Sequence, residues 1–509
     1  MGFTKIKGAD TIAGADKVYI DGPAATFGDL QTITLTPQGQ GDFVYGISSK
    51  VFTSSSFAGA SISAISGACE LESGTNPAGS ATIQLRRGLK YRAGQGSAMM
   101  ATALFDTPNA GNAQFIGAGT SECGYFIGYF GTAFGILHSQ TGQREVRAYT
   151  VTTGAGTADL TVTLDGNAIS VPVTGGSDIT QTAYQLSLHD YSQVGNGGWL
   201  ADAVGDTVYF IAARSNSTST GSYSIAGSTI DGSFARTKVG EAQTNTFIAK
   251  SSFNCDTLDG NGPSQMILDT DKGNIFQIDF QYLGFGNANF KIEDPETGKL
   301  VKFHIIKNAN NRTTPVLKNP NVNVLATSAN IGGTTSTKLK TSSMAGFIEG
   351  DVRNLDPKFS KSFTFSGINT ATYKPLAALK VNRVFNGESC FGEIDFLRLA
   401  GANTVNNQTV TIGLFLGAKI GGDVNYQYTS ENESITSFAT LNPGAGGNTI
   451  TNLSDLSPIF ELVVSSDSSN STNLEDLNVV IGLGDKFVIA IKTTASVTGQ
   501  VLLSWFEQQ

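Results

Sequence analysis

Apolar and polar residues alternate in short runs along most of the chain, and Gly, Asn and Pro separate these runs. Residues 30–35 and 81–85 alternate in this way, while residues 98–105 form an apolar run that suits a buried strand. Alternation with a period of two indicates strands with one buried face, and frequent turn residues are typical of antiparallel sandwiches. We therefore predict a mainly β protein made of antiparallel, jelly-roll-like β-sandwich domains.

One segment, residues 147–240, has a different pattern and predicts a small inserted α+β module. Residues 160–164 and 168–173 read as two strands around a tight Asp165-Gly166 hairpin turn. A helix signal follows, because Asp178 suits an N-cap and Gln181 stands three residues later. The apolar residues of one helix face are Ile179, Ala183 and Leu186. With further strands at 206–212 and 222–226, the module has the order ββαββ.

The composition before and after this module is alike, so we interpret the module as an insertion into one β domain. A polar stretch rich in Gly, Thr and Ser, residues 328–341, is the best candidate for a linker. The predicted units are a leader or anchor at 1–27, a first β-sandwich at 28–146 and 241–327, the module at 147–240, the linker at 328–341, and a C-terminal β-sandwich at 342–509.

Composition narrows the class of protein. Of 509 residues, 40% are hydrophobic and only 15% charged, and 60 are Gly, which favours a globular β chain over a disordered one. The net charge of -9 argues against nucleic-acid binding through a basic face. The densest basic cluster is short, and we predict that it is a solvated strand and turn surface. It consists of Arg86, Arg87, Lys90 and Arg92.

The first residues contain Lys5 and Lys7 but no apolar stretch after them, and nowhere do about 18 apolar residues run together. We therefore expect no export signal and no membrane insertion, and synthesis and assembly in the cytoplasm. The four cysteines are far apart and form no CxxC pair, so we predict buried thiols rather than a zinc or redox site. They are Cys69, Cys123, Cys255 and Cys390.

No residue pattern indicates catalysis. The three histidines, His138, His189 and His304, stand in separate contexts, and no GxSxG motif accompanies the many serines. We read His189-Asp190 as a surface pair rather than a catalytic dyad. We assign no catalytic, cofactor-binding or metal-ligating residue, leave binding residues open, and expect a protein that is not an enzyme and needs no cofactor.

Two glycine-bearing segments could suggest a ligand but are explained by backbone geometry. In residues 124–138, GYFIGYFGTAFGILH, a phosphate cradle would need GxGxxG or GKS and a following helix, so we favour bent strands. In DTDKGN, Asp269, Asp271 and Asn274 resemble the start of a calcium loop. Loop position 12 is Phe280 rather than Glu, and we predict a hairpin turn.

Three longer phrases carry a family resemblance. Residues 84–106 (QLRRGLKYRAGQGSAMMATALFD), 117–138 (GAGTSECGYFIGYFGTAFGILH) and 272–286 (KGNIFQIDFQYLGFG) resemble structural proteins of tailed bacteriophages and related large aquatic viruses, of the tail-fibre or spike-like kind. Residues 159–186 are similar to a small ββα module of phage tail and adhesion proteins. The resemblance covers about residues 28–316.

This resemblance implies a virion structural protein, a fibre, spike or baseplate-peripheral subunit that forms a homo-oligomer, often a trimer, with a role in host attachment. Its partners would be other copies of itself, other virion proteins and a host surface glycan or receptor. One alternative is a capsid decoration or cement protein. Another is a carbohydrate-binding adhesin that presents Tyr426, Tyr428 or Trp199 to glycans. A polysaccharide-degrading tailspike is least favoured, because no repeat of about 20 to 30 residues is present.

Overall fold

The computed structural model describes residues 9–11, 18–20, 34–174, 178–195, 197–227, 229–350, 356–475 and 480–508. Strands dominate, as predicted, and the described part of the chain has one α-helix and two short 3-10 turns, η1 (Lys250–Ser252) and η2 (Leu453–Asp455). Most of the predicted leader, 1–27, and most of the predicted strand at 30–35 lie outside these residues. In the described part of the leader, β1 (Ala9–Thr11) pairs antiparallel with β2 (Val18–Ile20).

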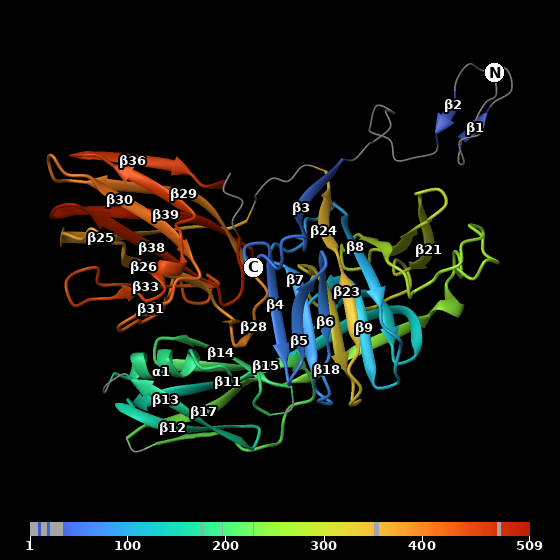
Figure 1. Ribbon diagram of the computed structural model, residues 1–509, viewed down its shortest axis with the longest axis horizontal. Helices are drawn as coiled ribbons and strands as arrows, with labels where there is room; N and C mark the ends of the chain where they lie inside the picture. The colour runs from blue at the N-terminus through green and yellow to red at the C-terminus, as the bar shows by residue number, and fades with distance from the viewer. Residues whose placement is uncertain are drawn as a thin grey trace.

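The first sandwich is made of two large antiparallel sheets (Figure 1). The ten-stranded sheet runs in the order β14 (Trp199–Val204), β15 (Thr207–Ser215), β11 (Ala133–Thr153), β10 (Gly124–Phe130), β9 (Asn112–Gly119), β22 (Asn323–Asn330), β7 (Ser80–Leu85) and β4 (Phe52–Phe57), with β17 (Asp231–Lys238) and β18 (Glu241–Ala249) on β11. The nine-stranded sheet runs β21 (Leu300–Ile306), β20 (Ala288–Glu293), β19 (Asn274–Phe280), β8 (Ser97–Phe105), β23 (Lys338–Thr341), β6 (Ala68–Glu72) and β5 (Ser61–Ile65), with β24 (Ser343–Glu349) joining β8 to β3 (Leu35–Asp42).

The core of this unit lies between the two sheets, because alternate residues of each strand point inward. Strand β8 shows this alternation in its burial, and Ile116, Ile127 and Phe276 are fully buried members of the core. The antiparallel β-sandwich class predicted from the sequence is therefore confirmed.

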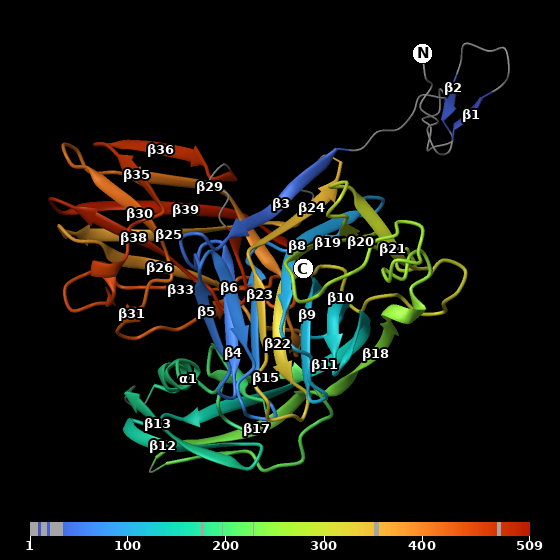
Figure 2. The ribbon, with the colours of Figure 1, turned by 45° about the vertical axis from the view of Figure 1, so that its right-hand side comes forward.

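The inserted module is continuous with the first sandwich. Strand β11 is 21 residues long, and its first part pairs with β10 and β18 while its second part pairs with β15 and β17. The module adds β12 (Thr157–Leu164), β13 (Asn167–Thr174) and β16 (Ser224–Ala226) as a three-stranded sheet, and α1 (Ile179–Ser187) packs on this assembly. Figure 2 shows the module below the two sandwiches. Strands β14 and β17 are additions to the predicted ββαββ order.

The predicted helix and its turn are confirmed. The Asp178 side chain accepts hydrogen bonds from the backbone N–H groups of Thr180 and Gln181, which are otherwise unsatisfied in the first helical turn. Ala183 and Leu186 are fully buried on the inner face. At the β12–β13 turn, Asp165 and Gly166 have φ angles of 51° and 75°, as a two-residue hairpin of the favoured twist requires.

The segment predicted as a linker, residues 328–341, is part of the first sandwich instead. Strand β22 pairs with β7 and β9, and β23 pairs with β6 and β8. Several polar side chains here are buried, among them Ser328 and Thr337, and Ser328 Oγ donates to the Thr337 carbonyl at 3.0 Å. Because β24 follows in the same sheet, the first sandwich extends to Glu349 rather than ending at 327.

The C-terminal sandwich packs a five-stranded sheet against a six-stranded one. The first contains β25 (Lys358–Ile368), β39 (Val497–Gln508), β29 (Glu393–Asn403), β36 (Ser468–Asn473) and β37 (Val480–Ile481). The second contains β32 (Gln427–Tyr428), β33 (Thr436–Thr440), β26 (Lys374–Val381), β38 (Lys486–Thr493), β30 (Val410–Leu416) and β35 (Phe460–Val464). Two small pairs, β27 (Val384–Phe385) with β28 (Glu388–Ser389) and β31 (Ile420–Gly421) with β34 (Thr449–Ile450), complete the unit.

Its core includes the fully buried Trp505 of β39, a strand that pairs with β25 and β29. In the part of the chain that the structure describes, no helix is long and apolar enough to cross a membrane.

Candidate functional site

The glycine-rich segment 124–138 forms the β10–β11 hairpin, in agreement with the strand interpretation. Its glycines leave room for aromatic rings on the outer face of the ten-stranded sheet. A Cβ atom at Gly135 would lie 2.2 Å from the Ile248 carbonyl oxygen and 2.8 Å from Cζ of Phe247. One at Gly117, on the neighbouring strand β9, would lie 2.1 Å from the Tyr125 carbonyl oxygen and 2.7 Å from Cδ1 of Phe126. Glycine at these positions therefore allows both close backbone approach and ring packing against the sheet.

The three histidines lie apart from one another. His138 is buried in the first sandwich, where Nε2 lies 2.8 Å from the Val316 carbonyl and the ring stacks on Tyr125 at 4.7 Å. Burial lowers its pKa to about 4. His304 Nδ1 accepts from the Asn254 backbone N–H at 3.2 Å. His189 contacts Tyr191 edge to face in the module.

Among the described residues, no group of three His, Cys, Asp or Glu side chains is placed to hold a metal ion. In the DTDKGN segment, Asp269 Oδ1 accepts from the Asp271 backbone N–H at 3.0 Å, as expected of the predicted turn. Three of the four cysteines are buried thiols, whereas Cys255 is half-buried, contrary to expectation.

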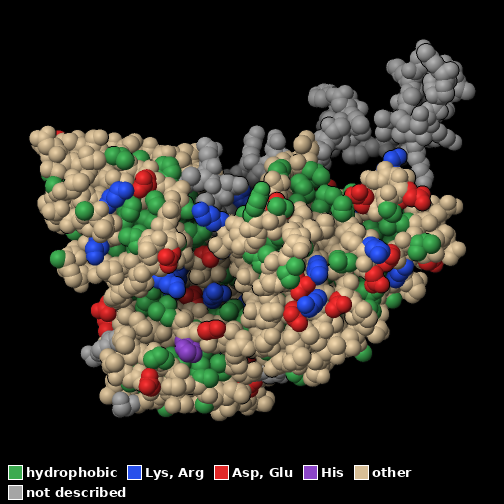
Figure 3. Space-filling view, viewed as in Figure 1, with side chains coloured by type: hydrophobic (Ala, Val, Ile, Leu, Met, Phe, Trp, Pro, Cys, Tyr) green, Lys and Arg blue, Asp and Glu red, His purple; other side chains and the backbone are tan. Residues whose placement is uncertain are grey.

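The basic cluster predicted as a solvated surface is instead an ionic joint between the two sandwiches. Each of its four cations pairs with an acidic residue from beyond residue 350. The pairs are Arg86 with Asp485, Arg87 with Asp395 at 2.9 Å, Lys90 with Asp395 and with Glu393 at 3.6 Å, and Arg92 with Asp356 at 3.9 Å. Only 4% of Lys90 is exposed. Figure 3 shows charged side chains of both signs beside the C-terminal sandwich, and further charged side chains over the first sandwich on the same face.

Burial and charge act in opposite directions on the two carboxylates of this joint. Burial raises the pKa of Glu393, against the attraction of Lys90. Burial would also raise the pKa of Asp395, but Lys90 and Arg87 outweigh it and hold that pKa below its usual value. The Gly88 backbone N–H donates to Glu393 Oε2 at 3.1 Å, so the backbone also takes part in the joint.

A second joint links the module to the C-terminal sandwich. Lys380 of β26 is buried against Asp202 of β14 and donates to the Ala203 carbonyl at 2.6 Å. The other Asp202 oxygen accepts from the Arg383 backbone N–H at 2.9 Å. Burial lowers the pKa of Lys380, although Asp202 opposes this shift.

Two of the aromatic residues considered for glycan binding belong to this second joint. Tyr426 is 3% exposed, and the Lys380 ammonium lies 4.7 Å from the centre of its ring. The Tyr428 hydroxyl is 3.3 Å from that of Tyr209 in the module. The Tyr426 ring is not presented to solvent as an adhesin site would require, so the expectation is wrong for this residue, whereas Tyr428 is half-buried.

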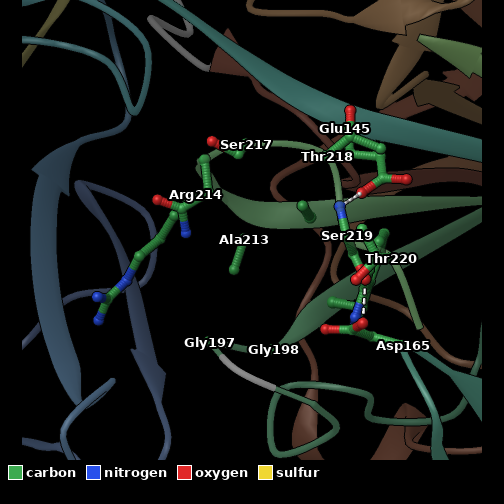
Figure 4. A pocket seen from close by; sticks show the side chains of 13 residues that line it. Glu145, Asp165, Gly197, Gly198, Ala213, Arg214, Ser217, Thr218, Ser219 and Thr220 are labelled. Carbon is green, nitrogen blue, oxygen red and sulfur yellow. Dashed lines mark hydrogen bonds between the residues drawn. The ribbon is translucent and has the colours of Figure 1, made fainter. Parts of the chain in front are cut away.

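A cavity of about 470 Å³ lies in the module, beside the loop at 216–220 (Figure 4). Its size is within the range of small-molecule sites, which is about 300 to 1,000 Å³. The walls are mostly polar and come from β11, β15, the β12–β13 turn and the loop. The lining residues are Glu145, Asp165, Gly197, Gly198, Trp199, Ala212, Ala213, Arg214, Asn216, Ser217, Thr218, Ser219 and Thr220.

The loop is held in place by two carboxylates, Glu145 on strand β11 and Asp165 in the β12–β13 turn. Glu145 Oε2 accepts from the Ser219 backbone N–H at 2.9 Å, while its Oε1 binds the Arg147 guanidinium at 2.6 Å. Asp165 Oδ1 accepts from the Ser219 hydroxyl and from the Gly221 backbone N–H at 3.2 Å. The cavity wall is therefore fixed by charge-assisted hydrogen bonds before any ligand enters.

A back wall of stacked side chains supports these groups. The Arg147 guanidinium lies 3.6 Å from the centre of the Tyr223 ring, and Trp199 meets that ring edge to face at 5.8 Å. Trp199, the third aromatic residue considered for glycan binding, lines the cavity but is only 4% exposed. Nearly all of the indole is therefore covered, and Trp199 presents no free stacking face.

Sequence reasoning used Asp165 only as a turn residue and did not single out Glu145 or the loop. A signal was present in the run NSTST at 216–220, where amide and hydroxyl side chains gather in one place. Such runs are common in this chain, and only the fold brings this one opposite two carboxylates.

Comparisons with known proteins assign this chain to no family. No family model matches the chain, and no curated protein matches it. One similar solved structure is the GH16 protein of the Bacteroides ovatus mixed-linkage glucan locus in complex with its G4G4G3G product, with 10% identity, a TM-score of 0.22, and coverage of 60% of this chain and 98% of that one. Another is the Faustovirus major capsid protein, with 9% identity, a TM-score of 0.09, and coverage of 92% and 90%. At these TM-scores neither likeness supports an argument about function.

Proposed function

We propose that this chain is a virion structural protein of the fibre, spike or baseplate-peripheral kind, which assembles as a homo-oligomer, takes part in host attachment and is not an enzyme. The observation that carries the proposal is the pair of ionic joints that fix the C-terminal sandwich to the first sandwich and to the module. Domains of one chain move relative to each other by default unless their interface resists it.

These joints resist such motion because their charges are buried. Removing one partner of a buried ion pair costs about 3 to 5 kcal/mol, since the other charge is left without compensation. Lys90 and Lys380 are both almost fully buried in such pairs. A body of fixed shape suits a particle subunit that must hold its neighbours in register, and contrasts with enzymes that open and close around a substrate.

Two further observations support the same class. The phrases at 84–106, 117–138 and 272–286 resemble structural proteins of tailed bacteriophages. In addition, Tyr45 is fully exposed beside Val44, which is 61% exposed, on the turn after β3. Exposed apolar neighbours of this kind suit a contact with another subunit.

The proposal is tested by the location of the protein on particles and by the mass of the purified protein in solution. Antibodies raised against the purified protein should label intact particles in the electron microscope, and light scattering on a sizing column should give a multiple, with three expected, of the 53.2 kDa chain mass. A protein found only in the lysed host and never on particles would overturn the proposal. A particle-bound protein that is monomeric in solution would favour the alternative of a capsid decoration or cement protein.

A further inference from the structure

We infer that the module cavity beside the loop at 216–220 binds a neutral saccharide. The inference deepens the proposed role in host attachment and rests on it for its biological meaning, although the site is argued from its own geometry. The cavity combines a fixed wall, a volume of about 470 Å³ and polar groups from four segments of the chain.

The groups free to meet a ligand are acceptors and neutral hydroxyls. Among the residues described around the cavity, the second carboxylate oxygen of Asp165 and the hydroxyls of Ser217 and Thr220 have no hydrogen-bond partner. In Figure 4 that Asp165 oxygen points toward Gly197 and Gly198, on the cavity side. A carboxylate accepts from sugar hydroxyls, and Ser and Thr hydroxyls can donate or accept as the ligand requires.

The charges argue against an anionic ligand. Arg214 is the only Lys or Arg among the lining residues, all of which lie in the described part of the module. Its guanidinium reaches away from the cavity and donates to the Ala78 carbonyl (Figure 4). Phosphate or sulfate recognition needs a cation aimed at the ligand, and none is placed so here.

The charges and rings also argue against an organic cation. The charge of Glu145 is balanced by Arg147, so Asp165 is the one carboxylate of the lining without a cationic partner in the described structure. A cation site would add aromatic faces, but Trp199 is 4% exposed and the Tyr223 ring is covered by Arg147. One carboxylate among neutral hydroxyls and amides matches a polyhydroxylated, uncharged ligand.

The experiment uses the full chain against an array of neutral oligosaccharides, followed by saturation-transfer NMR with any binder and with maltose and lactose. Asp165→Asn keeps the turn, because Asn-Gly suits it, but removes the charged acceptor. Ala213→Phe fills the cavity, and Asp159→Asn on exposed β12 is the matched control. We expect at least one neutral saccharide to bind, about tenfold weaker binding with Asp165→Asn, loss with Ala213→Phe, and no change with Asp159→Asn.

Three results would overturn the inference: no neutral saccharide bound by the folded wild type, binding of inorganic phosphate or spermidine in place of sugar, or sugar binding that both cavity variants leave unchanged. Circular dichroism of each variant shows whether it has folded. Failure here differs from failure of the proposed function, because particle labelling is measured separately. Labelled particles without sugar binding reject the site alone, and sugar binding without particle labelling rejects the virion role alone.

Discussion

Acidification should destabilise this protein through His138, and the size of the effect can be worked out from its surroundings. The side chain is 1% exposed between the sheets of the first sandwich, stacked on Tyr125 and hydrogen-bonded to the Val316 carbonyl. Burial lowers its pKa from 6.5 to about 4, so the folded protein holds it neutral where the unfolded chain would protonate it.

The sign follows from proton binding. Between pH 6.5 and 4 the unfolded chain binds a proton at this residue that the folded protein does not, so the free energy of unfolding falls as the pH falls. The stability is fully present above pH 6.5 and is lost toward pH 4. The gap of about 2.5 pH units corresponds to about 3 kcal/mol.

The assay is urea unfolding followed by circular dichroism at pH 7.5 and pH 4.5. His138→Gln keeps an N–H donor for Val316 but cannot take up the proton. We expect this variant to lose some stability at pH 7.5 through poorer packing on Tyr125, and to show a pH dependence smaller than that of wild type by about 3 kcal/mol. His189→Gln, at the half-exposed histidine of the module, is the control.

A His138→Gln variant that loses as much stability on acidification as wild type would refute the reasoning. It would mean that acid unfolding is governed by carboxylates or by His304, whose pKa burial also lowers.

Three other predictions concern the joints and the helix. Burial, with Lys380 and Arg383 nearby, lowers the pKa of Lys486 from 10.5 to about 8. The charged form of Lys486 therefore destabilises the folded protein at neutral pH, and this destabilisation disappears as the pH rises through 8 toward 10.5. In urea unfolding, Lys486→Met should raise the free energy of unfolding by up to about 3 kcal/mol at pH 7 and change it little at pH 10. Lys90→Met should leave the buried Glu393 without its ion-pair partner and Asp395 with Arg87 alone, and should cost about 3 kcal/mol, seen as faster proteolysis between the sandwiches, whereas the exposed Lys419→Met should not. Asp178→Ala should lower stability by about 1 kcal/mol in thermal unfolding and Asp178→Ser should restore most of it, a pattern that equal losses would contradict.

The sequence pattern correctly predicted the features that depend only on residues close together in the sequence. The cap at Asp178, the Asp165-Gly166 turn and the strand at 98–105 follow from residues within a few positions of one another, and all three are present. The bent-strand interpretation of 124–138 succeeded for the same reason, because Gly residues between aromatic ones have few uses outside a packed sheet.

The failures share one cause, which is that their partners lie far away in sequence. Ser328 is polar and reads as linker, but it is buried opposite Thr337 in the first sandwich. Tyr426 reads as an exposed ring, but the module covers it. In both cases composition indicated solvent, and tertiary contacts supplied the hydrogen bonds or the burial that solvent would otherwise have provided.

The basic cluster shows that a group of cations has a different meaning in a chain with few charged residues. A run of cations is normally a solvated face, and that reading suits chains with a typical share of charged residues, about 25%. Here only 15% of residues are charged, so four cations within seven positions, from Arg86 to Arg92, are unusual for this surface. Their acidic partners stand 264 to 399 positions further along, and no local pattern reveals them. In a chain this poor in charge, such a cluster is better taken as a prediction of an interface, whose partner only the fold can name.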